Sequence, residues 1–234
     1  MKKTMIALAM TTTLTAPAFA GMGDDPVLVK VMIDQLEIRS TDGADPLVME
    51  ADAWIGKDLT KAWFKADVER VDGETEQAEI QARYSRAVAP YWDFQVGLRH
   101  DLEPDDETRD WLALGFRGLA PYFFDIDAAL YVGENGRTQL SFDTEYEVML
   151  TQRVVLSPEL QVNFNGKSDP VLGLGSGLSN MEVGLRLRYE IKREFAPYIG
   201  VNWESTFGET ADFAKAEGDD SSDTQFVAGI RAWF

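Results

Sequence analysis

Apolar and polar residues alternate with a period of two along most of the chain beyond residue 45. In the stretch AWFKADVER, one row holds Ala62, Phe64, Ala66 and Val68, and the other holds Trp63, Lys65, Asp67 and Glu69. A period of two is typical of β-strands. The pattern predicts strands near residues 30–39, 47–56, 61–70, 76–87, 91–100, 110–119, 122–132, 137–149, 153–164, 180–190, 195–206 and 224–234. The first, KVMIDQLEIR, alternates poorly, so we expect a β-bulge there.

The connections between these strands alternate in length. Short turns at 57–60, 88–90, 120–121, 150–152 and 191–194 interleave with longer links at 40–46, 71–75, 101–109, 133–136, 165–179 and 207–223. Most strands approach the roughly ten residues that a tilted strand needs to cross a bilayer. Short periplasmic turns and longer outer loops are typical of outer-membrane proteins. The sequence therefore predicts an all-β fold, a transmembrane antiparallel outer-membrane β-barrel of about 12 strands.

A soluble β-sandwich is the alternative, because its strands alternate in the same way. Two features favour the barrel. The chain ends on an alternating strand, TQFVAGIRAWF, whose terminal phenylalanine is a feature associated with the outer-membrane assembly machinery. Aromatic residues also gather near the expected strand ends, as an interfacial girdle requires: Tyr91, Trp92, Trp111, Tyr122, Phe123, Phe195, Tyr198, Trp233 and Phe234. Membrane lipid and the assembly machinery are therefore expected partners. The strand count would fall by two if the first hairpin folded inward as a plug.

The first twenty residues, MKKTMIALAMTTTLTAPAFA, predict a secretory signal peptide. Lys2 and Lys3 precede an apolar stretch, and Ala18-Phe19-Ala20 fits a small-x-small cleavage site. We expect residues 1–20 to be removed on export to a Gram-negative cell outer membrane. Residues 21–29 would then form a short periplasmic segment, and residues 30–234 the barrel. The formal net charge of −18 argues against nucleic acid as a partner, and the absence of cysteine excludes thiolate chemistry.

One histidine and its acidic neighbours are candidate metal ligands. His100 ends the fifth expected strand and is followed by the loop DLEPDDETR, with Asp101, Glu103, Asp105 and Asp106. Imidazole with carboxylates would suit a metal site at the outer mouth. A solvated histidine beside an acidic loop explains the same residues. Met149 is a further candidate ligand, because its side chain can face the lumen.

Charged residues of both signs fall on the rows expected to face the interior. The main lumen-lining candidates are Asp67, Glu69, Asp93, Asp143, Glu145, Glu147, Arg186 and Arg188. The same rows hold Glu50, Asp52, Lys65, Glu79, Arg83, Arg99, Arg117, Asp125, Asp127, Glu204 and Arg231. These charges could form a packed interior of ion pairs or a cation-selective path. No serine lies within ten residues of the single histidine, so we expect neither catalytic residues nor an enzyme.

Several long stretches closely resemble the copper-resistance protein B family. They include AWIGKDLTKAWFKADVERVDG, EIQARYSRAVAPYWDFQVGLRHD, GLAPYFFDIDAALYVGENGRT and TADFAKAEGDDSSDTQFVAGIRAWF. The resemblance implies an outer-membrane protein of copper resistance that binds copper or mediates its passage across the outer membrane. It implies copper as the ligand, no cofactor for folding, and periplasmic copper-resistance proteins as possible partners.

The chain departs from that family in one respect, because it lacks the Met- and His-rich segment that many members carry ahead of the barrel. The alternative function is a general small cation-selective outer-membrane porin without metal specificity.

Overall fold

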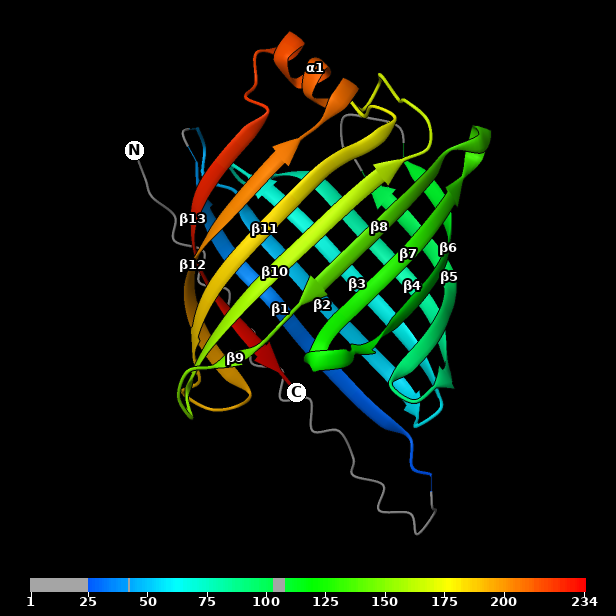
Figure 1. The fold of residues 1–234 in the computed structure, drawn as a ribbon, viewed down its shortest axis with the longest axis vertical. Helices are drawn as coiled ribbons and strands as arrows, with labels where there is room; N and C mark the ends of the chain where they lie inside the picture. The colour runs from blue at the N-terminus through cyan, green and yellow to red at the C-terminus, as the bar shows by residue number, and fades with distance from the viewer. Residues whose placement is uncertain (1–24, 42, 103–107) are drawn as a thin grey trace.

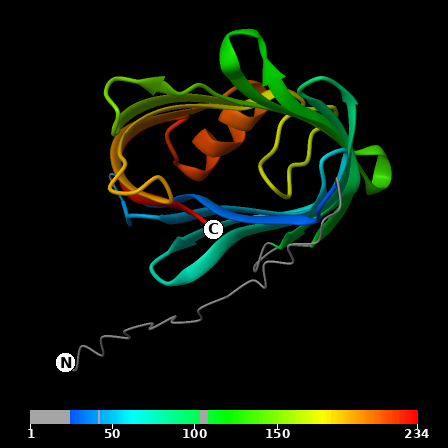
Figure 2. The same ribbon diagram turned by 90° about the horizontal axis from the view of Figure 1, so that it is seen from below.

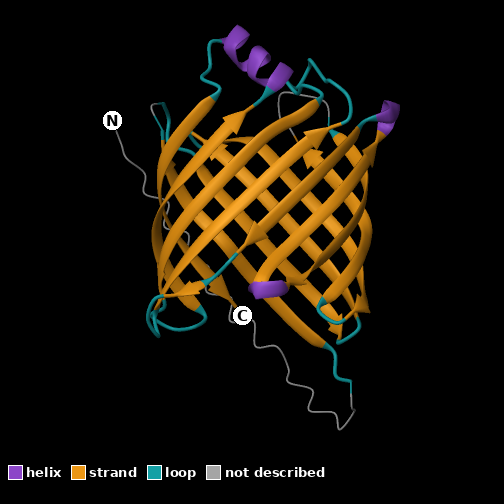
Figure 3. Ribbon diagram, viewed as in Figure 1, coloured by secondary structure: helices purple, strands orange, loops and turns teal. Residues whose placement is uncertain are grey.

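The computed structural model describes residues 25–41, 43–102 and 108–234. Within them the chain forms one antiparallel sheet that closes into a barrel, shown in Figure 1 and, by secondary structure, in Figure 3. The predicted outer-membrane-type barrel of twelve strands is thereby confirmed. The predicted signal peptide and its cleavage site lie outside the described residues.

The observed strands follow the predicted ones closely. They are β1 (Leu28–Ser40), β2 (Leu47–Lys57), β3 (Thr60–Val71), β4 (Glu74–Ala89), β5 (Trp92–Leu102), β6 (Arg109–Ala120), β7 (Phe124–Gly133), β8 (Thr138–Glu145), β9 (Val148–Met149), β10 (Val154–Asn165), β11 (Gly177–Tyr189), β12 (Phe195–Thr206) and β13 (Ser222–Trp233). Each strand pairs with its neighbours in the sequence, except that β8 and β9 both pair with β10. Strand β1 pairs with β13 to close the wall. The first hairpin is therefore part of the wall and not a plug.

The seam between β1 and β13 carries the predicted β-bulge. The register shifts between Ile33 and Leu36 against β13, and between Ile33 and Gln35 against β2. Beyond the bulge, Glu37 and Arg39 face inward and are buried, while Ile38 is exposed. The extra residue thus restores the alternation that the sequence obscured. At the other end of the seam, the Phe234 amide donates to the Val31 carbonyl oxygen at 2.8 Å.

The predicted strand at 137–149 is divided into β8 and the two-residue β9. Both segments pair with β10 in one continuous register, which places Tyr146 opposite Pro158. The Tyr146 amide donates to the Pro158 carbonyl oxygen at 3.1 Å, but proline has no N–H to return. The missing donor explains the interruption, so one predicted strand becomes two elements.

A helix in the last connection was not predicted. Helix α1 (Gly208–Glu217) ends at Gly218, which has a φ of 99° and is therefore in the left-handed region that glycine tolerates. Two 3-10 turns, η1 (Pro121–Phe123) and η2 (Glu134–Gly136), complete the structure. In the described part of the chain, no helix is both long and apolar enough to span a membrane.

The two ends of the barrel differ. The short turns and the C-terminus lie at one end, and α1 and the longer loops lie at the other (Figure 1). The separation of short turns from longer loops is the one that the sequence predicted, and we call the two ends periplasmic and outer after the usual arrangement of such barrels.

The barrel is polar inside and apolar outside. The most buried side chains include Glu37, Gln95 and Asn202, whereas Leu98 and Phe226 are 65% and 71% exposed. A water-soluble core would have the opposite distribution. Two residues assigned to the aromatic girdle do not belong to it, because Trp111 and Tyr198 are buried. Trp111 donates to a lumenal carboxylate through Nε1, and Tyr198 does so through its hydroxyl.

Candidate functional site

The barrel encloses a polar cavity of about 610 Å³. Among the described residues, fourteen carboxylates and six lysine or arginine side chains line it. The inward strand positions supply these residues because residues two apart along a strand share one face of the sheet. An excess of carboxylates on a low-dielectric wall concentrates cations. The cavity is therefore the natural candidate for a functional site.

One group of lumenal charges, the Glu37 cluster, is a closed set of ion pairs. Arg186 donates to both Glu37 carboxylate oxygens, from Nε at 2.9 Å and from Nη2 at 2.8 Å. Arg39 Nε and the Tyr198 hydroxyl also donate to Glu37, each at 2.9 Å. A further Arg186 nitrogen, Nη1, reaches Glu159 on β10. This cluster joins β1 to β10, β11 and β12 across the lumen.

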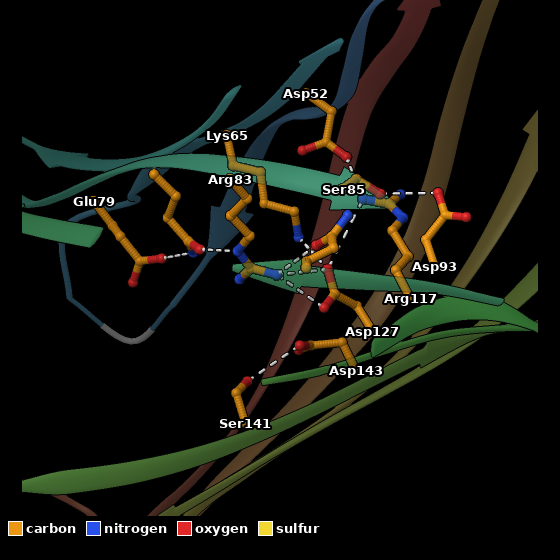
Figure 4. Close-up of polar contacts among 12 residues, drawn as sticks. Asp52, Lys65, Glu79, Arg83, Ser85, Asp93, Arg117, Asp127, Ser141 and Asp143 are labelled. Atoms are coloured by element: carbon orange, nitrogen blue, oxygen red, sulfur yellow. Dashed lines mark hydrogen bonds and ion pairs between the residues drawn. The ribbon is translucent and has the colours of Figure 1, made fainter. Parts of the chain in front are cut away.

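A second group, the Asp127 cluster, occupies the opposite wall and is drawn in Figure 4. Lys65 Nζ lies 2.6 Å from Asp127 Oδ2, and Arg83 Nη1 lies 3.1 Å from Asp127 Oδ1. Arg117 Nη1 pairs with Asp52 at 2.9 Å and lies 3.9 Å from Asp127. These contacts connect β2, β3, β4, β6 and β7. Like the Glu37 cluster, they hold the wall together from inside.

A third group closes the periplasmic end. Arg188 Nη2 lies 2.6 Å from Glu147 Oε1, and Arg231 Nη1 lies 3.0 Å from Glu145 Oε1. Arg231 also pairs with Asp34 at 3.2 Å. The interruption between β8 and β9 carries Glu147, whose side chain is half exposed.

The strand register also places carboxylates directly beside one another. Glu50 on β2 faces Asp67 on β3, Asp67 faces Glu79 on β4, and Glu79 faces Asp101 on β5. We call these four residues the acidic row. Directly opposite like charges destabilise a sheet. A bound or passing cation would relieve that repulsion.

Within the described part of the chain, the carboxylates at one end of the acidic row are ion-paired, and those at the other end are not. At the β4–β5 end, Arg99 pairs with both carboxylates, at 2.8 and 2.6 Å. At the β2–β3 end, neither Glu50 nor Asp67 has an ion pair among the described residues. Lys65, two residues before Asp67 on the same face, reaches into the Asp127 cluster instead. Two uncompensated carboxylates therefore face the cavity side by side.

A second line of opposite carboxylates lies on the other side of the barrel. Asp223 on β13 faces Glu204 on β12, which faces Glu182 on β11. Arg39 compensates Glu182 at 3.0 Å. Glu204 lines the cavity and makes no ion pair within the described ranges. Both walls of the outer half thus present carboxylates to the lumen.

The predicted lumen candidates all lie at the interior or its ends. Asp67, Glu69, Asp143 and Glu145 line the cavity. Arg186 belongs to the Glu37 cluster, and Arg188 and Glu147 belong to the periplasmic group. Asp93 accepts a hydrogen bond from the Ser85 hydroxyl at 2.9 Å.

The predicted metal ligands are not brought together at one point. His100 Nδ1 lies 2.7 Å from Asp110 Oδ1, and both side chains are exposed on the outward face. Asp101 faces inward, where it pairs with Arg99 and accepts a hydrogen bond from Trp111 Nε1 at 2.8 Å. The predicted ligands Glu103, Asp105 and Asp106 lie outside the described residues.

Met149 lies apart from these residues. It pairs with Val155 at the end where β9 lies and is 64% exposed. Among the described residues, no group of three histidine or acidic side chains is placed to hold a metal ion. The site around His100 therefore remains a prediction.

Sequence reasoning missed several of the interior charges. Glu37 and Arg39 lie in the strand whose alternation the bulge breaks, although the stretch QLEIR alone alternates. Glu159 was missed because the neighbouring Pro158 is unfavourable in a strand and obscures the alternation there. Asp169 lies in the β10–β11 loop, where no periodic pattern signals burial.

Comparison with known proteins gives one consistent family. The family described as Copper resistance protein B precursor (CopB) matches residues 27–234. Copper resistance protein B of Escherichia coli is 44% identical over 211 residues, covering 90% of this chain and 71% of that protein. A Copper resistance protein B homolog of Pseudomonas syringae pv. tomato is 39% identical over 201 residues, covering 86% and 68%.

Solved structures show the same architecture. The NanC porin superposes with a TM-score of 0.56 at 10% identity, covering 88% of this chain and 99% of that one. The KdgM porin superposes with a TM-score of 0.52, also at 10% identity and with the same coverage. At such low identity the likeness concerns the fold alone.

Proposed function

Because the chain belongs to the copper resistance protein B family, we propose that its lumen binds copper ions weakly and lets them cross the outer membrane. The acidic row carries this proposal. It places Glu50 and Asp67 directly opposite each other at the cavity wall, with no ion pair to either among the described residues. Such a pair attracts a cation without enclosing it.

The chemistry of the lining favours passage over storage. Among the described residues, the metal ligands that the cavity lining offers are mostly oxygen atoms, and Met32 supplies one thioether. Carboxylates suit harder ions, whereas thioether and thiolate ligands select Cu(I). Conduction requires sites strong enough to attract an ion and weak enough to release it. The lumen therefore suits hydrated Cu(II) better than tightly held Cu(I).

A general cation-selective porin without metal specificity is the second candidate. It is favoured by the absence of a three-ligand histidine or acidic group from the part of the chain that the structure describes. Such a porin would pass other divalent cations as readily as copper. The two candidates share the acidic row and differ in the response of cells to copper.

Reversal potentials in planar bilayers test the role of the acidic row. We expect the unmodified barrel to be cation-selective in a KCl gradient, and Glu50→Gln/Asp67→Asn to shift the reversal potential towards zero. The matched control is Asp58→Asn/Asp220→Asn, which removes the same charge from exposed turns at the two ends. An equal reversal potential in the acidic-row variant and the unmodified barrel would remove the lumenal basis of the proposal.

Copper accumulation in cells separates the two candidates. Cells that lack the protein should accumulate a different amount of copper from cells that carry it, whereas zinc and manganese should be unchanged. If all three metals change together, the general porin is the better description. If none changes, neither transport function holds.

A further inference from the structure

The β10–β11 loop, residues 166–176, lies across the outer mouth of the barrel. Viewed from below in Figure 2, this loop and α1 lie within the outline of the barrel wall. Asp169 and Leu174 pair as an isolated bridge, with Asp169 N donating to Leu174 O at 2.7 Å. Leu172 and Leu174 line the lumenal cavity. We call this segment the mouth loop.

The mouth loop is attached to the barrel wall by one buried carboxylate. Asp169 Oδ2 lies 3.0 Å from Arg109 Nη1 on β6 and 2.9 Å from Arg137 Nε beside β8. The side chains of Asp169 and Arg109 are each 7% exposed. The loop starts at β10 and returns to β11, so this contact reaches sideways to strands that the loop does not connect. Both contacts are ion pairs, and ion pairs attract more strongly where the groups are removed from water than at an exposed surface.

The other side of the mouth loop rests on α1. Gly175 N donates to Thr210 Oγ1 at 2.8 Å, and Thr210 Oγ1 lies 3.1 Å from Ser179 Oγ. The Ser168 hydroxyl donates to the Glu209 carboxylate. Through these hydrogen bonds α1 supports the mouth loop, and the two segments together form the cover of the outer mouth.

The cover leaves an opening at the far rim. A second cavity of about 300 Å³ lies between Leu172 and Leu174 of the mouth loop and Glu69, Glu76 and Gln77 of the β3–β4 hairpin. The wall side of this opening is acidic, and the loop side is apolar. The loop tip therefore approaches the opposite rim without an ion pair to it among the described residues.

We propose that the mouth loop is a lid over the outer end of the lumen and that Asp169 is its latch. The Asp169 carboxylate holds the loop down by pairing with Arg109 and Arg137 and offsets one of their two positive charges. When the latch is broken, the loop swings away from β6 and β8, the mouth widens, and two guanidinium groups become unpaired at the entrance. The inference relies on the proposed function only in treating the lumen as a passage.

Asp169→Asn tests the latch by single-channel conductance in KCl. We expect higher conductance together with lower cation selectivity, because the entrance is wider and also more positive. A purely electrostatic effect would lower cation conductance instead, so the two readouts separate movement from charge. The matched control, Asp220→Asn, removes one charge from an exposed outer loop and should leave both readouts unchanged.

A disulfide between the mouth loop and α1 tests the movement directly. A Cβ built on Gly173 lies 3.8 Å from Phe213 Cβ, close to the mean separation of about 3.8 Å in disulfides. Gly173 has a φ of 62°, so the single variant Gly173→Cys also measures the effect of a strained side chain at this position. The chain has no cysteine of its own. In Gly173→Cys/Phe213→Cys/Asp169→Asn, oxidation should lower the conductance gained by unlatching, and a reductant should restore it. The two single-cysteine variants serve as controls.

The outcomes are decisive in both directions. Equal conductance of Asp169→Asn and the unmodified barrel, with folding verified by heat-dependent mobility on gels, would overturn the lid. A gain that oxidation does not reduce would overturn movement relative to α1. Loss of selectivity in the acidic-row variant with an intact response to Asp169→Asn would support both proposals separately.

Discussion

The Glu37 cluster and the acidic row line the same lumen, but among the described residues the carboxylates are ion-paired in the cluster and two of them are unpaired in the row. Glu37 is 1% exposed and accepts hydrogen bonds from two arginines and a tyrosine hydroxyl. Glu50 and Asp67 face the cavity without a cation partner within the described ranges. Buried charges that are fully paired stabilise geometry, whereas unpaired charges of one sign create a field. The first region therefore maintains the barrel, and the second is available to ions.

The largest expected effect comes from breaking the Glu37 cluster. Arg186→Leu leaves Glu37 and Glu159 without their shared guanidinium, which should destabilise the folded barrel by about 3–5 kcal/mol. Urea titration of the refolded protein, followed by tryptophan fluorescence, measures the loss. The double variant Arg186→Leu/Glu37→Leu should recover part of it, since the buried Glu37 carboxylate is removed as well and only Glu159 is then left without its arginine. A double variant less stable than Arg186→Leu would contradict the paired interpretation.

A smaller loss is expected from Tyr198→Phe. The substitution removes only the hydroxyl that donates to Glu37 at 2.9 Å. Hydrogen bonds to charged groups contribute about 1.5–3 kcal/mol. The same urea titration gives the value, and Tyr84→Phe, on an exposed outward position, is the control. If both tyrosine variants have equal stability, the hydroxyl contact does not stabilise the cluster.

Removing charge from the acidic row should raise the free energy of unfolding, whereas the two substitutions above lower it. Glu50→Gln/Asp67→Asn removes repulsion between directly opposite carboxylates and should stabilise the barrel by about 0.2–1 kcal/mol. The gain in unfolding free energy would accompany the loss of cation selectivity. A clear destabilisation would mean that these carboxylates are paired structurally after all, and the contrast between the two regions would disappear.

The smallest effect is expected at His100. Its ring contacts Asp110 on the outward face, away from Asp101 and the lumen. We expect His100→Ala to leave the affinity for Cu(II) unchanged in calorimetric titrations, with Zn(II) as the comparison metal. A severalfold weaker affinity would instead support the predicted metal site at the outer mouth.

The repeating part of the fold could be predicted from the sequence, because each strand carries its own period-two signal. The predictions failed where a single residue interrupts this alternation. Pro158 cannot return a hydrogen bond to the strand beside it, so β8 ends early. The bulge after Ile33 conceals the inward row that contains Glu37.

The ion pairs could not be predicted from the sequence, because they depend on the tertiary structure. Alternation predicts that Lys65 and Asp127 face inward, but not that they meet across 62 residues at 2.6 Å. Asp169 gives no signal at all, because a loop has no period. Its burial follows from the positions of Arg109 and Arg137, which the closed wall determines.

The seam between β1 and β13 has a consequence for biogenesis. Because the first strand pairs with the last, no intermediate length of chain can have a complete wall. A chain shortened by β13 would expose the edges of both β1 and β12, and lipid offers no water to satisfy them. Closure of the barrel is therefore all-or-none. Until β13 pairs with β1 and β12, the sheet has two unpaired edges, and afterwards it has none.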